Sequence, residues 1–219
     1  DIVTREFGCP VHYLAATDPA GAWCGVLPLV RLRSRLFGDF LVSLPFFNYG
    51  GVLAADGEAD AALVAAAGAL GTRLGVSHIE FREQQPRAGW PVRTDKVAMV
   101  LDLAPTVDGQ WAALGSKLRA QIRRPEKEGA ITRLGGAELV ADFYRVFARN
   151  MRDLGTPVYA RSLFRRITDQ LPAQARIAVV YLQGQPVAAG FTVRHGDRLE
   201  IPWASSLREW NRVGVNMQL

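Results

Sequence analysis

The chain alternates between short apolar runs with strand spacing and longer stretches in which apolar residues recur every three or four positions. The first kind predicts strands over 11–16, 23–32, 40–44 and 78–82, and the second predicts an alanine-rich helix over 58–74 that ends at Gly75. Residues 84–91 read as a loop. The apolar run of residues 44–54 breaks at Asn48, Tyr49, Gly50 and Gly51, where two glycines permit close backbone approaches.

The second half carries longer amphipathic segments. Its pattern predicts strands over 97–103, 131–134 and 199–204, helices over 106–124, 138–154 and 161–171, a hairpin of 177–182 and 187–194 about Gly184, a polar loop over 205–212, and a helix from Val213. From residue 97 this order is similar to that of a GNAT-type acyltransferase lobe. The fold class expected is α+β with mixed sheets, as two GNAT-like lobes over residues 1–96 and 97–219.

The most distinctive stretch is the predicted helix over 106–124. Its apolar stripe is Trp111, Leu114, Leu118 and Ile122, and Asp108 is a plausible N-terminal cap. The opposite side carries four cations within eight positions, which repel one another along a helix. They are Lys117, Arg119, Arg123 and Arg124. We interpret this face as a platform for a phosphate-bearing substrate; an ordinary solvated basic face remains the alternative.

Pro125 follows directly and lacks an N–H group, so we expect the helix to kink or stop near Arg124. Gly129 then ends the segment. The 219 residues include 26 Lys and Arg against 21 Asp and Glu, a net charge of +5. This balance is compatible with an anionic partner without demonstrating one.

Few other residues suggest a catalytic or metal-binding function. Cys9 and Cys24 form no metal-binding spacing, and the histidines are scattered. No apolar run reaches the length of a membrane span and no signal peptide is present, so we expect a cytoplasmic protein. The chain begins at Asp1 without methionine and stops at Leu219 within an apolar run, so we expect a fragment whose second lobe lacks its C-terminal part.

Three stretches together resemble the FemAB-like family of tandem-GNAT acyl and aminoacyl transferases. They are LVSLPFFNYGG (41–51), LRAQIRRPEKEGA (118–130) and FYRVFARNMRDLGTPVY (143–159), and with the strand PWASSLREWNR (202–212) they span most of the chain. The chain is most similar in look to the members associated with PEP-CTERM/exosortase systems. The resemblance implies two packed GNAT-like lobes that transfer an acyl or aminoacyl group to an amine, in peptidoglycan-like cell-envelope or exopolysaccharide metabolism.

The chain departs from that family at two places. Proline is unusual in the family where Pro125 stands, and the family's Phe-Lys-containing segment falls beyond Leu219. The loops that would cradle the CoA pyrophosphate are also incomplete, because only Gly214 fits in 211–216 and only Gly51 fits in 48–53. We therefore expect no cofactor, and an aminoacyl-tRNA or another activated carrier as donor in preference to acyl-CoA.

The candidate substrate-binding residues come from four places. They are Asn48, Tyr49, Gly50 and Gly51; Lys117, Arg123 and Arg124; Tyr159; and Trp203, Arg208 and Asn211. For several of them a structural role is equally open: an ordinary turn for residues 48–51, and core packing for Tyr159 and Trp203. The expected partners are an anionic small molecule or nucleotide-linked sugar, and tRNA.

No nucleophile with an adjacent base is recognisable, so the reaction expected is direct attack of an amine on an activated ester. The sequence assigns no catalytic residue; Asp197 and Glu200 are candidate bases only by their position near a strand end. Two other classes stay open. A non-catalytic degenerate-GNAT module would bind an anionic polymer or a protein partner, and an RNA-binding regulator would show strongly salt-dependent affinity.

Overall fold

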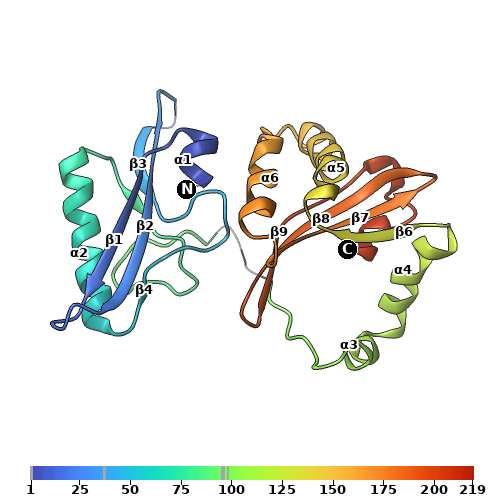
Figure 1. Ribbon diagram of the computed structural model, residues 1–219, viewed down its shortest axis with the longest axis horizontal. Helices are drawn as coiled ribbons and strands as arrows, with labels where there is room; N and C mark the ends of the chain where they lie inside the picture. The colour runs from blue at the N-terminus through green and yellow to red at the C-terminus, as the bar shows by residue number, and fades with distance from the viewer. Residues whose placement is uncertain (1, 37, 95–96, 98) are drawn as a thin grey trace. The chain divides into compact units, whose positions relative to one another are not determined.

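The computed structural model describes residues 2–36, 38–94, 97 and 99–219, and the chain divides into two compact units (Figure 1). Unit 1 spans Asp1–Val97 and unit 2 spans Ala98–Leu219. The boundary expected from the sequence lies one residue earlier. Each unit has its own sheet and its own helices, which confirms the α+β class.

Unit 1 is a five-stranded sheet with two helices. Its elements are α1 (Ile2–Phe7), β1 (Val11–Thr17), β2 (Trp23–Ser34), β3 (Gly38–Val42), β4 (Leu53–Ala54), α2 (Gly57–Leu74) and β5 (Ile79–Glu80). The strand order is β1-β2-β3-β5, with β4 also paired to β2, and among the described residues of unit 1 only the β3–β5 pair is parallel. A parallel neighbour requires a crossover, and α2 supplies it.

The crossover helix also covers the core of unit 1. Leu63, Ala67 and Leu70 of α2 are buried against Leu27, Leu29 and Leu41 of the sheet. Asp56 caps the helix by accepting from the Ala59 amide at 2.8 Å, and Gly75 ends it in the left-handed conformation (φ 68°). The predicted helix and its stop are therefore confirmed.

Unit 2 has a four-stranded antiparallel sheet in the order β6-β7-β8-β9. Its elements are α3 (Val107–Ala113), α4 (Ser116–Lys127), β6 (Ile131–Gly135), the 3-10 helix η1 (Ala137–Leu139), α5 (Val140–Asp153), α6 (Arg161–Gln170), β7 (Ala175–Leu182), β8 (Gln185–His195), β9 (Arg198–Ser206) and the 3-10 helices η2 (Arg208–Trp210) and η3 (Val215–Gln218). The predicted hairpin turns at Gln183 and Gly184, which both have positive φ.

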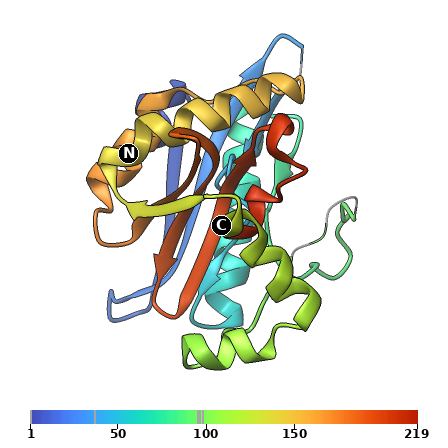
Figure 2. The ribbon, with the colours of Figure 1, turned by 90° about the vertical axis from the view of Figure 1, so that its right-hand side faces the viewer.

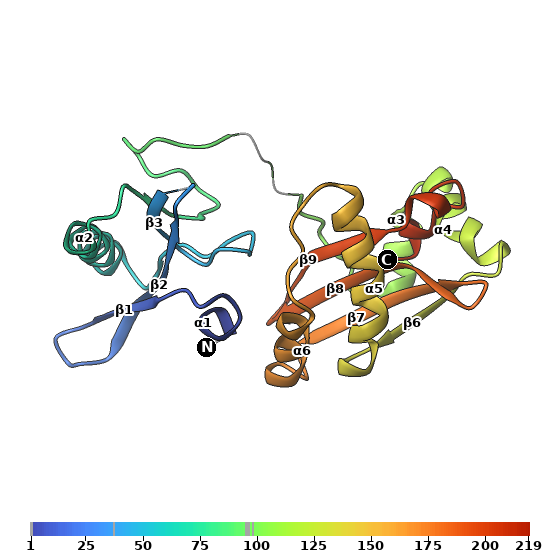
Figure 3. The same cartoon turned by 90° about the horizontal axis from the view of Figure 1, so that it is seen from above.

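The two faces of this sheet have different covers (Figures 1 and 3). On one face, Phe143 of α5 and Phe164 of α6 pack against Phe191 of β8, with ring centroids 4.9–5.8 Å apart. On the other, Val215 of η3 is buried with Val180 and Ala188. The helices predicted over 138–154 and 161–171 thus form, and both bury apolar residues in a core.

Several sequence predictions are wrong. No strand forms at residue 97 or 99–103, where the apolar side chains are largely exposed and no neighbouring strand pairs with them; Ala98 lies outside the described residues. The predicted helix over 106–124 is two helices, α3 and α4, broken at Leu114 and Gly115. The helix expected from Val213 is only the short η3, and Ser205 and Ser206 belong to β9.

The N-terminal cap of α3 and the proline within α4 also differ from the sequence predictions. Thr106, and not Asp108, caps α3, because its extended backbone lets the hydroxyl accept from the Gly109 amide at 3.1 Å. Pro125 does not stop α4, which continues to Lys127. Pro125 lacks the N–H that would donate to the Gln121 carbonyl, so one helical hydrogen bond is lost, and the residue is buried. Gly129, with φ +86°, ends the segment as predicted.

Candidate functional site

The basic helix α4 presents three candidate residues to solvent. Lys117, Arg123 and Arg124 are all exposed, as is Lys127. Arg123 lies over the Trp111 ring, with 5.1 Å between the guanidinium carbon and the ring centroid. Lys117, Arg124 and Lys127 take part in none of the ion pairs within the described part of the chain. Their charges are therefore free to meet an anion.

Arg119, the fifth cation of α4, has a structural role instead. Arg119 donates through Nη1 to the carbonyls of Trp111, Ala112 and Leu114, which lie at the C-terminal end of α3. A guanidinium suits this place because the last carbonyls of a helix lack intrahelical partners. Arg119 thus joins α3 to α4 across the break at Gly115, and the apolar stripe stays half-buried through both helices.

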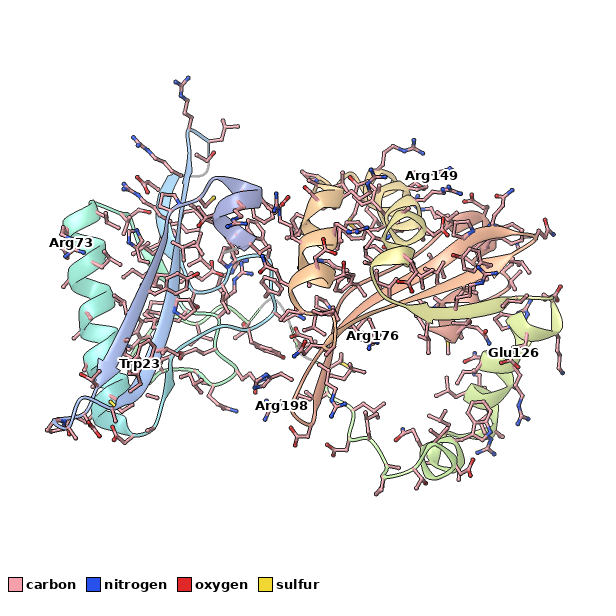
Figure 4. All side chains as sticks on the ribbon, viewed as in Figure 1. Trp23, Arg73, Glu126, Arg149, Arg176 and Arg198 are labelled. Carbon is pink, nitrogen blue, oxygen red and sulfur yellow. The ribbon has the colours of Figure 1, made fainter. Side chains whose placement is uncertain are left out.

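Gln218 connects α4 to the rest of unit 2. Its amide nitrogen donates to the Ile122 carbonyl at 2.8 Å and to Glu126 at 3.2 Å, and its oxygen accepts from Thr132 of β6 at 3.0 Å. Glu126, marked in Figure 4, is the single carboxylate on α4. Sequence reasoning missed Gln218, because its three partners are between 86 and 96 residues away along the chain.

In unit 1 the four candidates Asn48–Gly51 form part of a loop between β3 and β4. Asn48 is exposed, whereas Tyr49, Gly50 and Gly51 are half-buried. A Cβ on Gly50 would lie 2.4 Å from the Leu44 Cβ, and one on Gly51 would lie 2.1 Å from the Glu83 Cγ. Close approach, and not a positive φ, therefore explains why glycine occupies both positions.

The aromatic candidates of unit 2 lie together. The Tyr159 ring is 6.3 Å from that of Trp203 and 6.4 Å from that of Phe147. Trp203 is 7% exposed and packs edge-on to Phe164 at 5.1 Å. Trp203 is thus a core residue, the alternative that the sequence left open. Tyr159 is half-buried at the margin of the same cluster.

Arg208 and Asn211 follow the end of β9. Both are exposed, and Arg208 donates through Nη2 to the Asp153 carbonyl at the end of α5, at 2.9 Å. Beneath them, Asn150 of α5 donates to the buried Ser205 hydroxyl at 3.1 Å. These bonds fix the β9–η2 junction against α5. The Asn150–Ser205 contact could not be found in the sequence, since neither residue stands out in its local pattern.

Two backbone amides of the loop after η2 donate hydrogen bonds to carbonyls of the same segment. Val213 donates to the Trp210 carbonyl at 3.0 Å and Gly214 donates to the Asn211 carbonyl at 3.1 Å. Gly214 has φ +81°, and the helix that follows has only four residues. A pyrophosphate site needs free amides at a helix N-terminus. This loop does not offer the Val213 and Gly214 amides for that purpose.

The two candidate bases lie elsewhere. Asp197 is in the exposed turn between β8 and β9, and Glu200 is near the start of β9. Arg208 follows the opposite end of this nine-residue strand, so Asp197 is roughly 30 Å away from it by strand geometry. Asp197 therefore cannot act as the base for a substrate held at Arg208.

One further cluster was not found from the sequence. The Tyr181 hydroxyl donates to Asp142 of α5 at 2.6 Å, and Arg133 of β6 lies over the Tyr181 ring at 5.1 Å. Burial, followed by this hydrogen bond, raises the pKa of Tyr181 to about 12. The cluster borders a hollow of about 250 Å³ beside Gly129 and Gly184.

The described residues, which omit 1, 37, 95–96 and 98, contain no group of three or more His, Cys, Asp or Glu side chains placed to hold a metal ion. Nor do they include a helix with the length and apolar character needed to cross a membrane.

The comparisons with known proteins agree on the fold. Residues 115–219 match the family model described as an acetyltransferase (GNAT) domain, so the match begins at the residue that precedes α4. No curated protein matches the chain. The crystal structure of FemX superposes with a TM-score of 0.64 at 11% identity, over 99% of this chain and 76% of that one.

A second solved structure is the C-terminal DUF2156 domain of an Agrobacterium fabrum protein described as a lysylphosphatidylglycerol synthetase. It gives a TM-score of 0.55 at 11% identity, over 99% of this chain and 66% of that chain, slightly less than two thirds. At such identities the likeness concerns the fold alone. The chain therefore has a FemAB-like GNAT fold, and residues 115–219 of unit 2 match the GNAT-domain model.

Proposed function

We propose that this chain is an acyl or aminoacyl transferase that moves an activated acyl group to an amine acceptor in cell-envelope metabolism. The observation that carries the proposal is the GNAT-domain match over residues 115–219, a range that includes α4 and the whole unit 2 sheet. The name of the Agrobacterium fabrum protein refers to a lysyl-bearing phospholipid, which supports an aminoacyl group as the one transferred.

The basic face of α4 would hold the phosphates of one substrate. Lys117 and Arg124 are exposed, and each lacks a carboxylate partner within the described residues. Arg123 adds a guanidinium that already lies over Trp111. Guanidinium groups bind phosphate oxygens in bidentate fashion, whereas lysine acts as a point charge. The hydrogen bonds of Gln218 would keep this face in a fixed orientation.

Aminoacyl-tRNA, or another activated carrier, is the proposed donor, and two features support it over acyl-CoA. In unit 2 the Val213 and Gly214 amides already have acceptors. In unit 1 the helix that follows the glycine loop has Asp56 as its cap and Glu58 and Asp60 in its first turn. Carboxylates at a helix N-terminus occupy or repel the place where a pyrophosphate would bind.

The chemistry proposed is attack of the acceptor amine on the carbonyl carbon of the activated ester. The new C–N bond forms as the ester C–O bond breaks, the carrier hydroxyl leaves, and the amine loses one proton. The protein contributes chiefly by holding both substrates in the reactive geometry. Arg208 and Asn211 beyond β9, with Tyr159 at the margin of the aromatic cluster, are the polar groups proposed to contact the reacting end.

Binding measurements test the proposal. Acetyl-CoA, a mixed pool of aminoacyl-tRNA and a nucleotide-linked amino-sugar precursor are each titrated at two salt concentrations. We expect the charged tRNA pool to bind more tightly than the deacylated pool, with affinity that falls as salt rises. Lys117→Ala and Arg124→Ala should each weaken binding, whereas Arg73→Ala removes one exposed charge from α2 in unit 1 and should not. Saturable acetyl-CoA binding would instead indicate an ordinary acetyltransferase.

A non-catalytic GNAT-like binding module is the second candidate. The amides after η2 favour this candidate, because they donate to carbonyls of the same loop and so fit a protein that has lost its acyl-donor site. Turnover separates the two: a transferase moves label from the donor to an amine, whereas a binding module holds an anionic polymer without consuming it.

A further inference from the structure

The loop between β3 and β4 in unit 1, residues 43–52, has an unusual backbone. Leu44 and Phe46 both adopt positive φ values, 49° and 75°, although neither is glycine. Such a conformation is unfavourable for a residue that has a side chain, and it persists only where the surroundings impose it. The crowding at Gly50 and Gly51 shows that the loop is also packed tightly against Leu44 and Glu83.

Two consecutive residues after β5 hold this loop, and we call Arg82 and Glu83 the loop clamp. The Arg82 amide donates to the Ser43 hydroxyl at 2.8 Å, its Nη1 donates to the Phe47 carbonyl at 2.9 Å, and its carbonyl accepts from the Gly50 amide at 3.0 Å. The Glu83 carboxylate accepts from the Val52 amide at 3.1 Å. The four bonds are spread along the whole loop.

Ion pairs with Arg87 hold Glu83 of the loop clamp in place. Arg87 donates to Glu83 at 2.7 Å and to both carboxylate oxygens of Asp60 on α2, at 2.6 and 2.8 Å. The Glu83 and Arg87 side chains are 17% and 21% exposed. Such partly buried, bidentate contacts are stronger than exposed pairs. The Glu83 carboxylate therefore has a fixed position beneath Gly51.

This arrangement decides what the loop can bind. The Gly50 and Val52 amides already donate to Arg82 and Glu83, so they cannot cradle a phosphate. Glu80, Glu83 and Asp60 also outnumber the guanidinium groups of Arg82 and Arg87, which leaves the surroundings unfavourable to an anion. The loop is suited to a neutral, hydrogen-bonding group such as a peptide amide or a sugar hydroxyl.

We propose that Arg82 and Glu83 are positioning residues that hold loop 43–52 in its strained conformation, so that Asn48 and Tyr49 are presented to an uncharged peptide or sugar part of the acceptor. The clamp acts through the loop and does not touch the substrate. The assignment of the loop to an acceptor rests on the proposed transferase function. The mechanical role of the clamp does not.

Hydrogen exchange followed by mass spectrometry tests the clamp in the intact chain. Glu83→Ala removes the carboxylate that accepts hydrogen bonds from the Val52 amide and from Arg87. We expect exchange across 43–52 to rise about tenfold or more while α2 and β1 stay unchanged. Acetate should restore protection by supplying a carboxylate, and chloride at equal ionic strength should not. Glu83→Gln, whose amide oxygen can still accept from Val52, should lie between wild type and Glu83→Ala.

The matched control is Asp39→Ala, which breaks a comparable ion pair with Arg31 (2.6 Å, side chains 22% and 27% exposed) in the same sheet. It should leave exchange in 43–52 as in wild type. The proposal is overturned if Glu83→Ala behaves like Asp39→Ala, or if all of unit 1 exchanges faster together, since Glu83 would then only stabilise the fold.

A second readout addresses the acceptor. Glu83→Ala should weaken binding of the nucleotide-linked amino-sugar precursor about tenfold, and acetate should recover part of the loss. Unchanged affinity with a loosened loop would contradict the positioning role. If wild type binds neither donor nor acceptor, the proposed function fails, whereas the exchange result still decides whether the clamp exists.

Discussion

Gln218 of η3 donates to the main-chain carbonyl of Ile122 at 2.8 Å, and this bond connects the C-terminal 3-10 helix to the middle of the basic helix α4. The same side chain also bonds Glu126 and Thr132, so it joins α4 to the edge strand β6. Figure 2 shows the C-terminal end of the chain beside α4. A single amide thus fixes the helix that carries the proposed phosphate contacts.

Replacing Gln218 with alanine should loosen α4. The loss of three hydrogen bonds should lower the free energy of unfolding of unit 2 by about 1–2 kcal/mol. It should also speed hydrogen exchange in 116–127 more than in the α5–α6 side of the sheet. Gln121→Ala, at an exposed position on α4, is the control and should change neither. Equal effects of both variants would show that the Gln218 contacts do not hold the helix.

Arg119 should be required for the break between α3 and α4. Arg119→Ala removes the donor to three carbonyls at the end of α3, and we expect loss of helical signal with faster exchange over 107–113. Arg119→Lys should rescue little, because an ammonium cannot reproduce the guanidinium fork. Lys117→Ala should leave α3 intact. Full rescue by lysine would mean that charge alone matters there.

Gly51→Ala should disturb the glycine loop. The new Cβ would lie 2.1 Å from the Glu83 Cγ, so the carboxylate must move away from the Val52 amide. We expect a destabilisation of about 1–3 kcal/mol in unit 1 by chemical denaturation. In a Glu83→Ala background the same change should cost much less, which a double-mutant cycle measures. Gly57→Ala, where nothing lies within 4 Å, should be tolerated.

The Asp60–Arg87 pair predicts an acid dependence. Hydrogen bonds from Arg87 hold the pKa of Asp60 below its ordinary value of 3.8. A lowered folded-state pKa means that this stabilisation is present above about pH 4 and is lost as pH falls through the folded-state pKa. The difference in unfolding free energy between wild type and Asp60→Asn should therefore shrink below pH 4. A difference that grows with acid would contradict the contact.

The raised pKa of Tyr181 predicts a loss of stability at alkaline pH. Its folded-state pKa of about 12 lies above the ordinary value of 10, so the neutral phenol is favoured by folding. The associated stabilisation is complete below pH 10 and is lost between pH 10 and 12. The absorbance difference between wild type and Tyr181→Phe should show phenolate appearing near pH 12. Titration near pH 10 would mean that Tyr181 has neither the burial nor the Asp142 contact in solution.

The parts of the fold that local pattern controls were predictable. Helix α2, with the stop at Gly75, and the hairpin at Gly184 follow from periodicity and from glycine conformations. The failures have a different origin. Arg119 reaches back from α4 to the carbonyls of α3 across the break at Gly115, and α4 continues past Pro125, which is buried. Neither is visible in hydrophobic spacing.

The candidate site shows the same division. The exposed cations Lys117, Arg123 and Arg124 could be named from the sequence because their type and spacing are unusual. Gln218, Glu83 and Asn150 could not, since each acts through partners dozens of residues away. Trp203 was ambiguous for a related reason: a tryptophan at a strand end suits a ligand wall and a core equally well, and packing decided for the core.

The proposed transferase activity is tested most directly by transfer of a labelled amino acid from a charged tRNA pool to an amine on a nucleotide-linked amino-sugar precursor. We expect label in the acceptor with wild type, a large loss with Lys117→Ala or Arg124→Ala, and an unchanged rate with Arg73→Ala. Absence of transfer by wild type, or transfer from acetyl-CoA alone, would contradict it.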